Sequence, residues 1–209
     1  MSKAQNDFNT IARIYDQLSK MVYADRLIKA QEHYLGKLPT EGRVLFIGGG
    51  SGEILPRIWG RKPRLQIDFI DASSSMINLA EKQLRKYPKA KTNFICGTEA
   101  DMEPDAQYDA VLTFFFLDLF KAEKKLSVAS KLKSHLKPKG IWLHADFLPA
   151  SDKLSKLREK LMFKFFKSVS RIEADEITDD QRIFDAIGIK CVENRTFGRK
   201  VYAAVYESK

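Results

Sequence analysis

The sequence has few cysteines and no long apolar run. Two cysteines, Cys96 and Cys191, occur among its 209 residues, too few for a disulfide framework or a cysteine-based metal site, and we expect both to be buried in strands. The most apolar run, Ala110 to Leu117, is far too short to cross a bilayer, and the first residues, MSKAQNDF, lack the apolar core of a signal peptide. A reducing cytoplasm is therefore the expected location.

The two signs of charge are not balanced. The chain carries 36 Lys and Arg against 27 Asp and Glu, a formal net charge of +9, which concerns association and not the fold. More than half of the excess lies in residues 152–171, where apolar side chains recur at helical spacing. Three interpretations of this segment compete: a helix packed on the sheet edge, a lid over an apolar substrate, or a helix in weak contact with an anionic membrane surface. We favour packing combined with a lid.

Apolar spacing divides the chain into helices and short strands. Residues 6–38 show helical spacing, closed by Pro39 and Gly42, and short apolar runs then alternate with helical stretches. Strands separated by helices favour a parallel sheet built from βαβ units, and the last two runs, joined at Gly198 and Arg199, favour a hairpin. Seven strands are expected over 44–47, 65–70, 93–96, 110–114, 141–147, 189–197 and 201–207, with helices over 52–59, 74–87 and 121–136.

A glycine-rich turn follows the first predicted strand. Residues 44–47 run directly into GGGSG at 48–52, and helical spacing resumes at Ile54. A strand that enters a helix through such a turn lets backbone N–H groups approach a ligand closely. Asp71 ends the next strand, about 20 residues further on, where such folds place a carboxylate that accepts hydrogen bonds from a ribose. The alternative is that the glycines only make a tight turn and that Asp71 caps the following helix.

The residues after the turn narrow the class of ligand. Glu53 stands where the third glycine of a G-x-G-x-x-G fingerprint would be, and its carboxylate would repel a pyrophosphate. Gly52 is not followed by Lys and then Ser or Thr, as a phosphate loop requires. An adenosine ligand without phosphates, carrying a sulfonium and an ammonium group, fits these residues better.

Four stretches of the chain resemble a known family. VLFIGGGSG, IDFIDASSSMINLA, YDAVLTFFFLDLF and LKPKGIWLHADF resemble the successive motifs of class I S-adenosylmethionine-dependent methyltransferases, and FNTIARIYDQL resembles the opening of the ubiquinone and menaquinone methyltransferase group. The resemblance implies a Rossmann-like three-layer α/β sandwich with a mainly parallel seven-stranded sheet, a C-terminal antiparallel hairpin and an N-terminal helical cap. It implies one domain, made of the cap (1–40), a donor-binding core (41–150), a lid-like helical insertion (151–178) and the last helix with the hairpin (179–209).

The same resemblance implies which residues bind S-adenosylmethionine, the methyl donor. Three glycines would form the donor-binding turn, Asp71 would hold the ribose, Met76 would lie near the adenine and Tyr15 would cover the donor. For Met76 and Tyr15, packing in the core is the alternative. The full set is Tyr15, Gly48, Gly50, Gly52, Asp71, Met76, Thr98, Glu99 and Phe114.

Two positions depart from the family pattern. Phe46 stands where the family usually has Asp or Glu in the first strand, which leaves the methionine end of the donor less well explained. Thr98 stands where an Asp commonly meets the adenine amino group. Glu99 or Asp101 could replace that carboxylate.

Methyl transfer from a sulfonium depends mainly on alignment of the reactants and exclusion of water. If the acceptor must lose a proton, His144 and Asp146 are the candidate bases, and they point to the same side of a predicted strand. A hydrogen-bonded structural histidine is the alternative for His144. Residues 114–116 could form the wall of an apolar acceptor pocket or belong to the core, and Asp118 is expected to cap the helix near Lys121. No metal is expected.

The sequence favours an enzyme that methylates a small molecule, which is apolar, aromatic or carboxylate-bearing, and that acts as a monomer or homodimer. An RNA methyltransferase is the enzymatic alternative. No separate RNA-binding module and no NPPY-like or paired-cysteine motif occurs in the sequence, so nucleic acid is not the expected partner. A protein that retained the fold and lost catalysis is the third alternative.

Overall fold

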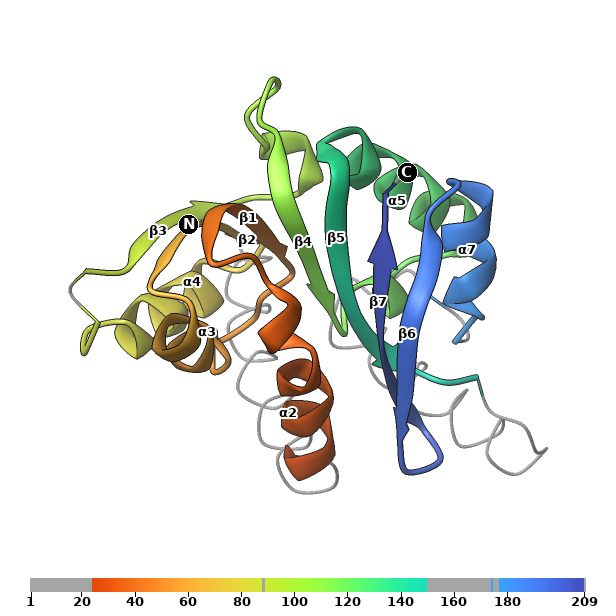
Figure 1. Cartoon of the computed structure of the whole chain (residues 1–209), viewed down its shortest axis with the longest axis horizontal. Coiled ribbons are helices and arrows are strands. Elements are labelled where there is room, and N and C mark those ends of the chain that lie inside the picture. Colours follow the sequence, from red (N-terminus) through yellow and green to blue (C-terminus); the bar gives the residue numbers. More distant parts are fainter. Residues whose placement is uncertain (1–23, 88, 150–173, 175–176, 209) are drawn as a thin grey trace, which may run out of the picture.

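A seven-stranded sheet organises the computed structural model, which describes residues 24–87, 89–149, 174 and 177–208 (Figure 1). The strand order is β3-β2-β1-β4-β5-β7-β6, and β7 runs in the direction opposite to the other six strands. The expected mainly parallel sheet with a C-terminal hairpin is thereby confirmed. The strands are β1 (Glu41–Ile47), β2 (Arg64–Asp71), β3 (Lys91–Cys96), β4 (Tyr108–Phe114), β5 (Leu136–Phe147), β6 (Lys190–Phe197) and β7 (Val201–Glu207).

Helices cover both faces of this sheet. One apolar cluster joins the first helices to sheet residues such as Phe46 and Leu112, and a second joins the later helices to Val111 and Trp142. The three layers follow because both faces of a parallel sheet must be kept from water. On the first face lie α2 (Ala24–His33), η1 (Leu35–Lys37), α3 (Leu55–Arg61) and α4 (Ser74–Gln83); on the second, α5 (Ala122–Ser134) and α7 (Asp180–Ala186). Two further short 3-10 turns are η2 (Glu99–Asp101) and η3 (Leu117–Leu119).

The ends of some elements differ from the predicted bounds. β7 has the predicted bounds, whereas β5 begins at Leu136 and not at 141. The early part of β5 pairs with Tyr108 through an irregular register. Its Pro and Gly residues interrupt the apolar pattern that would have predicted a strand there. α3 begins at Leu55 and not at Gly52, with Pro56 in its first turn as expected.

The prediction that both cysteines are buried is wrong. Cys96 is exposed and Cys191 is half-buried, and both are free thiols. Their place in the sheet explains this difference, because β3 and β6 are its two edge strands. An edge strand has a neighbouring strand on one side only.

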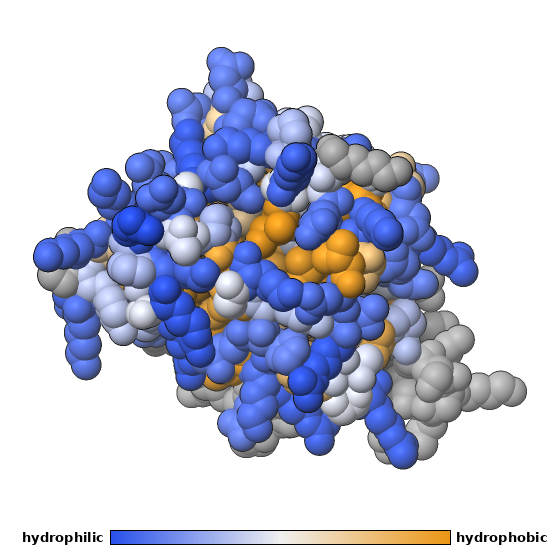
Figure 2. Space-filling model, in the orientation of Figure 1, coloured by the Kyte–Doolittle hydropathy of each residue, from blue (hydrophilic) through white to orange (hydrophobic). Residues whose placement is uncertain are grey.

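Two predicted segments fall largely outside the described residues. The N-terminal cap is represented by α2, and Tyr15 lies outside the described part. The basic segment 152–171 lies outside it as well, so its three interpretations stay predictions. Within the described ranges, no helix is both long and apolar enough to cross a membrane. Figure 2 shows polar side chains over most of the visible face, with an apolar area near the middle of the view.

Candidate functional site

The glycine-rich turn leaves β1 with three residues in the left-handed region. Gly48, Gly50 and Gly52 have φ values of 66°, 58° and 68°, which glycine adopts at little cost. A Cβ atom on Gly48 would lie 2.2 Å from the Phe116 ring, so packing also demands glycine there. A Cβ atom on Gly50 would have no neighbour within 4 Å among the described residues. The backbone at Gly50 therefore faces open space that a ligand can approach.

Asp71 connects this turn to the end of β2. The Gly50 N–H donates to Asp71 Oδ2 at 2.8 Å, and the Ser73 N–H donates to Asp71 Oδ1 at 2.9 Å. Burial raises the pKa of Asp71, although the hydrogen bonds from Ser73 and Gly50 act against the rise. The N-cap of α4 is Ser73, whose hydroxyl accepts from Met76 N–H, so Asp71 does not cap that helix. Each carboxylate oxygen keeps one lone pair for a further hydrogen bond.

The residues expected at the adenine lie after β3. Gly97 N–H donates to the Asp71 carbonyl, which places Thr98 beside the end of β2. Thr98 and Asp101 form a capping box, in which Thr98 N–H donates to Asp101 Oδ2 at 2.8 Å. The Glu99 carboxylate forms an ion pair with Lys124 at 2.9 Å. Both acids proposed as replacements for the family aspartate are therefore already bonded within the chain.

Phe46 and Phe114 belong to the apolar core. The Phe46 ring makes edge contacts with Phe69 and Phe114, at centroid distances of 5.1 and 5.5 Å. A carboxylate at position 46 would lie unpaired among aromatic rings, so the core built by these rings accounts for the departure from the family pattern. The next residue after Phe114 is strained: Phe115 has a φ of 54° and packs against Phe147.

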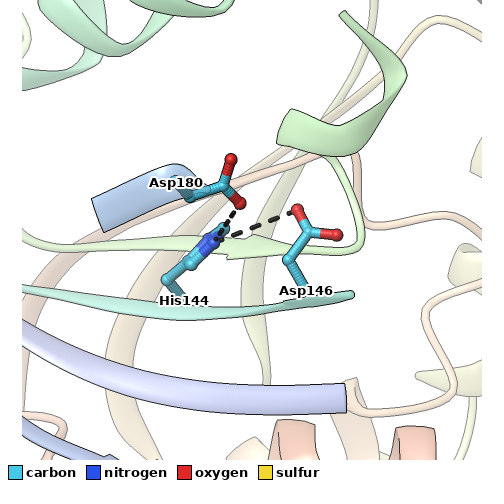
Figure 3. A group of neighbouring side chains, drawn as sticks. All are labelled: His144, Asp146 and Asp180. Atoms are coloured by element: carbon cyan, nitrogen blue, oxygen red, sulfur yellow. Dashed lines mark hydrogen bonds and ion pairs between the residues drawn. The ribbon is translucent and has the colours of Figure 1, made fainter. Parts of the chain in front are cut away.

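The candidate bases His144 and Asp146 share one face of β5, as predicted, and both side chains are buried. His144 Nδ1 lies 2.9 Å from Thr113 Oγ1 and 3.1 Å from the Thr113 carbonyl oxygen. His144 Nε2 lies 2.9 Å from the Tyr202 hydroxyl and 3.1 Å from Asp180 Oδ2. Figure 3 shows the imidazole between the Asp180 and Asp146 carboxylates. Both ring nitrogens thus already have partners within the chain.

Two buried carboxylates, Asp146 and Asp180, lie beside this histidine, and a third, Asp118, interacts with them. Asp146 accepts from Asp118 N–H at 3.2 Å, and Lys125 Nζ lies 2.6 Å from Asp180 Oδ1. Burial and the charge of Asp180 raise the pKa of Asp118 to about 7. Burial, Asp118 and Asp180 together raise the pKa of Asp146 well above its usual range. Burial by itself would raise the pKa of Asp180, but His144 and Lys125 outweigh burial and lower the pKa of that carboxyl.

Sequence reasoning missed Asp180 and Lys125 and was wrong about Asp118. The N-cap residue of α5 is Lys121, whose side chain makes no capping hydrogen bond, whereas Asp118 is buried and its Oδ1 atom has no partner among the described residues. A signal for Lys125 existed, because it lies on the buried stripe of α5 with Val128. A lysine on such a stripe predicts a buried acidic partner.

The strand order and the placement of the glycine turn and Asp71 define the class of protein. Both features lie at the carboxyl ends of adjacent parallel strands, where open α/β sheets bind their ligands. Together with the reversed β7, they give the Rossmann-like methyltransferase fold that the motifs imply.

Comparisons with known proteins agree with this class. A family model described as a methyltransferase domain matches residues 45–142. The malonyl-[acyl-carrier protein] O-methyltransferase of Priestia megaterium is 29% identical over 145 residues, covering 67% of this chain and 49% of that protein. The demethylmenaquinone methyltransferase of Thermotoga maritima is 26% identical, covering 70% and 62%. The chain thus spans about half the length of several curated relatives it matches.

Solved structures show the same fold. A Burkholderia thailandensis 1,6-didemethyltoxoflavin-N1-methyltransferase, with bound 1,6-didemethyltoxoflavin and S-adenosylhomocysteine, has a TM-score of 0.70 and 11% identity. The alignment covers 99% of this chain and 88% of that one. The methyltransferase-domain model and the curated relatives indicate a class I S-adenosylmethionine-dependent methyltransferase, and the solved structures share its fold.

Proposed function

We propose that the chain transfers a methyl group from S-adenosylmethionine to a small-molecule acceptor that bears a carboxylate, either free or attached to a carrier. The observation that carries the proposal is the hydrogen bond between Gly50 N–H and Asp71, beside open space at Gly50. A ligand there meets the backbone of the glycine turn on one side and a carboxylate on the other. That pairing suits an adenosine with no phosphates.

The residues present fit the donor. The two remaining lone pairs of Asp71 can accept hydrogen bonds from the two ribose hydroxyls, and the Gly50 backbone can lie against the ligand because no Cβ intervenes. The bound donor would supply an activated methyl carbon. Residues 48–52 and Asp71 would hold it in one orientation, and the region of Thr98 and Glu99 would meet its adenine. Alignment and exclusion of water then provide most of the rate acceleration.

A carboxylate acceptor suits this chain because it needs no base. One of its oxygens bonds to the methyl carbon, the carbon–sulfur bond breaks, and the electron pair of that bond goes to sulfur. No proton moves at neutral pH, since the acid is already ionised. His144 and Asp146, at 1% and 0% exposure, then have no proton to remove. Their role as bases stays a prediction for acceptors that must lose a proton.

The relatives support this acceptor class. Three curated matches at 29% identity are named as malonyl-[acyl-carrier protein] O-methyltransferases, whose named acceptor carries a carboxyl group on a carrier protein. A carboxylate acceptor also agrees with the formal net charge of +9, because an excess of basic residues attracts anions.

A transfer assay tests the proposal. The full chain is incubated with methyl-labelled S-adenosylmethionine and, separately, with malonyl thioesters, free dicarboxylic acids and total RNA. We expect base-labile label in the carboxylate acceptors, because a methyl ester hydrolyses in alkali. Label in RNA alone would favour the RNA methyltransferase instead. Donor binding without transfer to any acceptor would favour a protein that lost catalysis.

A further inference from the structure

The buried polar cluster behind β5 contains more acidic than basic side chains. Asp118, Asp146 and Asp180 are each at most 8% exposed, and Lys125 Nζ lies 2.6 Å from Asp180 Oδ1. Ionisation of all three acids would leave negative charge that one ammonium group cannot offset. Buried charges of one sign require a counter-charge, which is either protons or a bound cation.

The orientation of His144 suits a metal ligand. Its Nδ1 atom lies 3.1 Å from the Thr113 carbonyl oxygen, which can only accept a hydrogen bond. When Nδ1 carries the proton, the Nε2 lone pair faces the Tyr202 hydroxyl at 2.9 Å as well as Asp180 Oδ2 and Asp146 Oδ2, so an ion bound there would replace the Tyr202 hydrogen bond. A metal-bound histidine usually donates its other N–H to a carbonyl or carboxylate in this way, because that bond fixes the tautomer and the ring orientation.

Two distances within the cluster lie in the range expected between ligands of one ion. Two donor atoms at about 2.1 Å from an ion lie about 3.0 Å apart at a right angle and about 4.2 Å apart when opposite. His144 Nε2 is 3.1 Å from Asp180 Oδ2 and 3.9 Å from Asp146 Oδ2. The three ligand atoms all lie within 4.8 Å of one another (Figure 3).

Asp118 supplies an independent indication. Its Oδ1 atom is buried and has no hydrogen-bond partner among the described residues. Its backbone N–H donates to Asp146 Oδ2, so position 118 adjoins the cluster, although its carboxylate is not among the three groups whose ligand atoms lie within 4.8 Å of one another. An orphaned buried carboxylate oxygen calls for a missing partner, and a cation is one.

We propose that His144, Asp146 and Asp180 bind a divalent first-row metal ion. One imidazole nitrogen and two carboxylates form a ligand set suited to Zn²⁺ or Mn²⁺. Lys125 holds the other oxygen of Asp180 and so fixes its orientation. The ion would join β5 and α7. This proposal departs from the expectation of no metal and is independent of the proposed methyl transfer.

Metal binding to the full chain tests the proposal. The protein carries no affinity tag and has Cys96→Ser and Cys191→Ser, because free thiols bind these metals adventitiously. After removal of metal with a chelator, it is titrated with Zn²⁺ and Mn²⁺ by calorimetry and with Co²⁺ by visible absorption. We expect one ion per chain and a raised Tm in its presence. Failure of all three ions to bind would overturn the proposal.

Variants locate the bound ion. His144→Gln and Asp180→Asn should weaken binding by about 100-fold or more, because each removes a ligand. His135→Gln is the matched control: His135 is also buried, but it bonds to the Ala106 carbonyl outside the cluster. Unchanged binding in His144→Gln would overturn the assignment. If that variant does not fold, NMR of the parent protein replaces it: the nitrogen chemical shift of His144 Nε2 should change when Zn²⁺ is added. An unchanged chemical shift would overturn the assignment of His144 as a ligand.

Discussion

Replacing Asp71 with alanine removes the carboxylate on which the proposed donor site depends. In the structure this carboxylate accepts hydrogen bonds from Gly50 N–H and Ser73 N–H, and two lone pairs remain for the ribose. A hydrogen bond to a charged group contributes about 1.5–3 kcal/mol. Water fills part of the space left by the side chain, so we expect a total loss of about 2–4 kcal/mol. This loss weakens binding of S-adenosylhomocysteine about 30- to 1000-fold.

Calorimetric titration of the variant and the parent chain measures this loss. Asp109→Ala is the matched control, because Asp109, like Asp71, accepts a hydrogen bond from a backbone N–H, that of Arg43 at 2.8 Å. Asp109 additionally accepts a hydrogen bond from Lys137. Asp109 lies at the start of β4, at the amino ends of the parallel strands, whereas the glycine turn lies at their carboxyl ends. Its loss should reduce stability and leave affinity unchanged. Equal affinity in Asp71→Ala and the parent chain would refute the ribose assignment.

Three further predictions follow from the same region. Because burial raises the pKa of Asp71, donor affinity should fall as the pH is lowered through a value above 3.8, and affinity in Asp71→Asn should not follow pH in this range. The raised pKa of Asp71 also affects stability. The free energy of unfolding should fall as the pH rises from the pKa of Asp71 in the unfolded chain to its pKa in the folded chain, because the folded chain holds this proton more tightly. In urea unfolding, Gly48→Ala should reduce the free energy of unfolding by about 1–3 kcal/mol more than Gly50→Ala does, because the new Cβ atom at position 48 also clashes with Phe116. Equal reductions in the two variants would contradict the packing argument. Phe46→Ala should cost about 3–5 kcal/mol of unfolding free energy, and a negligible cost would show that the aromatic cluster does not hold β1.

The fold could be predicted from the sequence because its local signals agree with one another. β7 has its predicted bounds, and Gly198, with a φ of 70°, makes the expected hairpin turn. The glycine turn and Asp71 could be predicted as partners because strand ends at the same edge of a parallel sheet lie close together. The start of β5 was missed because Pro138 and Gly140 interrupt its apolar pattern.

The buried cluster was only half predictable. Alternation along β5 placed His144 and Asp146 on one face, and the structure confirms it. Asp180 comes from a helix more than thirty residues later in the chain, and no local pattern states which helix face meets which strand. Asp118 resembled a helix cap because it precedes α5, but it lies within η3 and its side chain is buried.

Calorimetric titration of the full chain with S-adenosylhomocysteine tests the central claim most directly. The turn at residues 48–52, with open space at Gly50, and the spare lone pairs of Asp71 predict saturable binding at one site per chain. The absence of binding at millimolar ligand would contradict the donor site and the proposed methyl transfer with it.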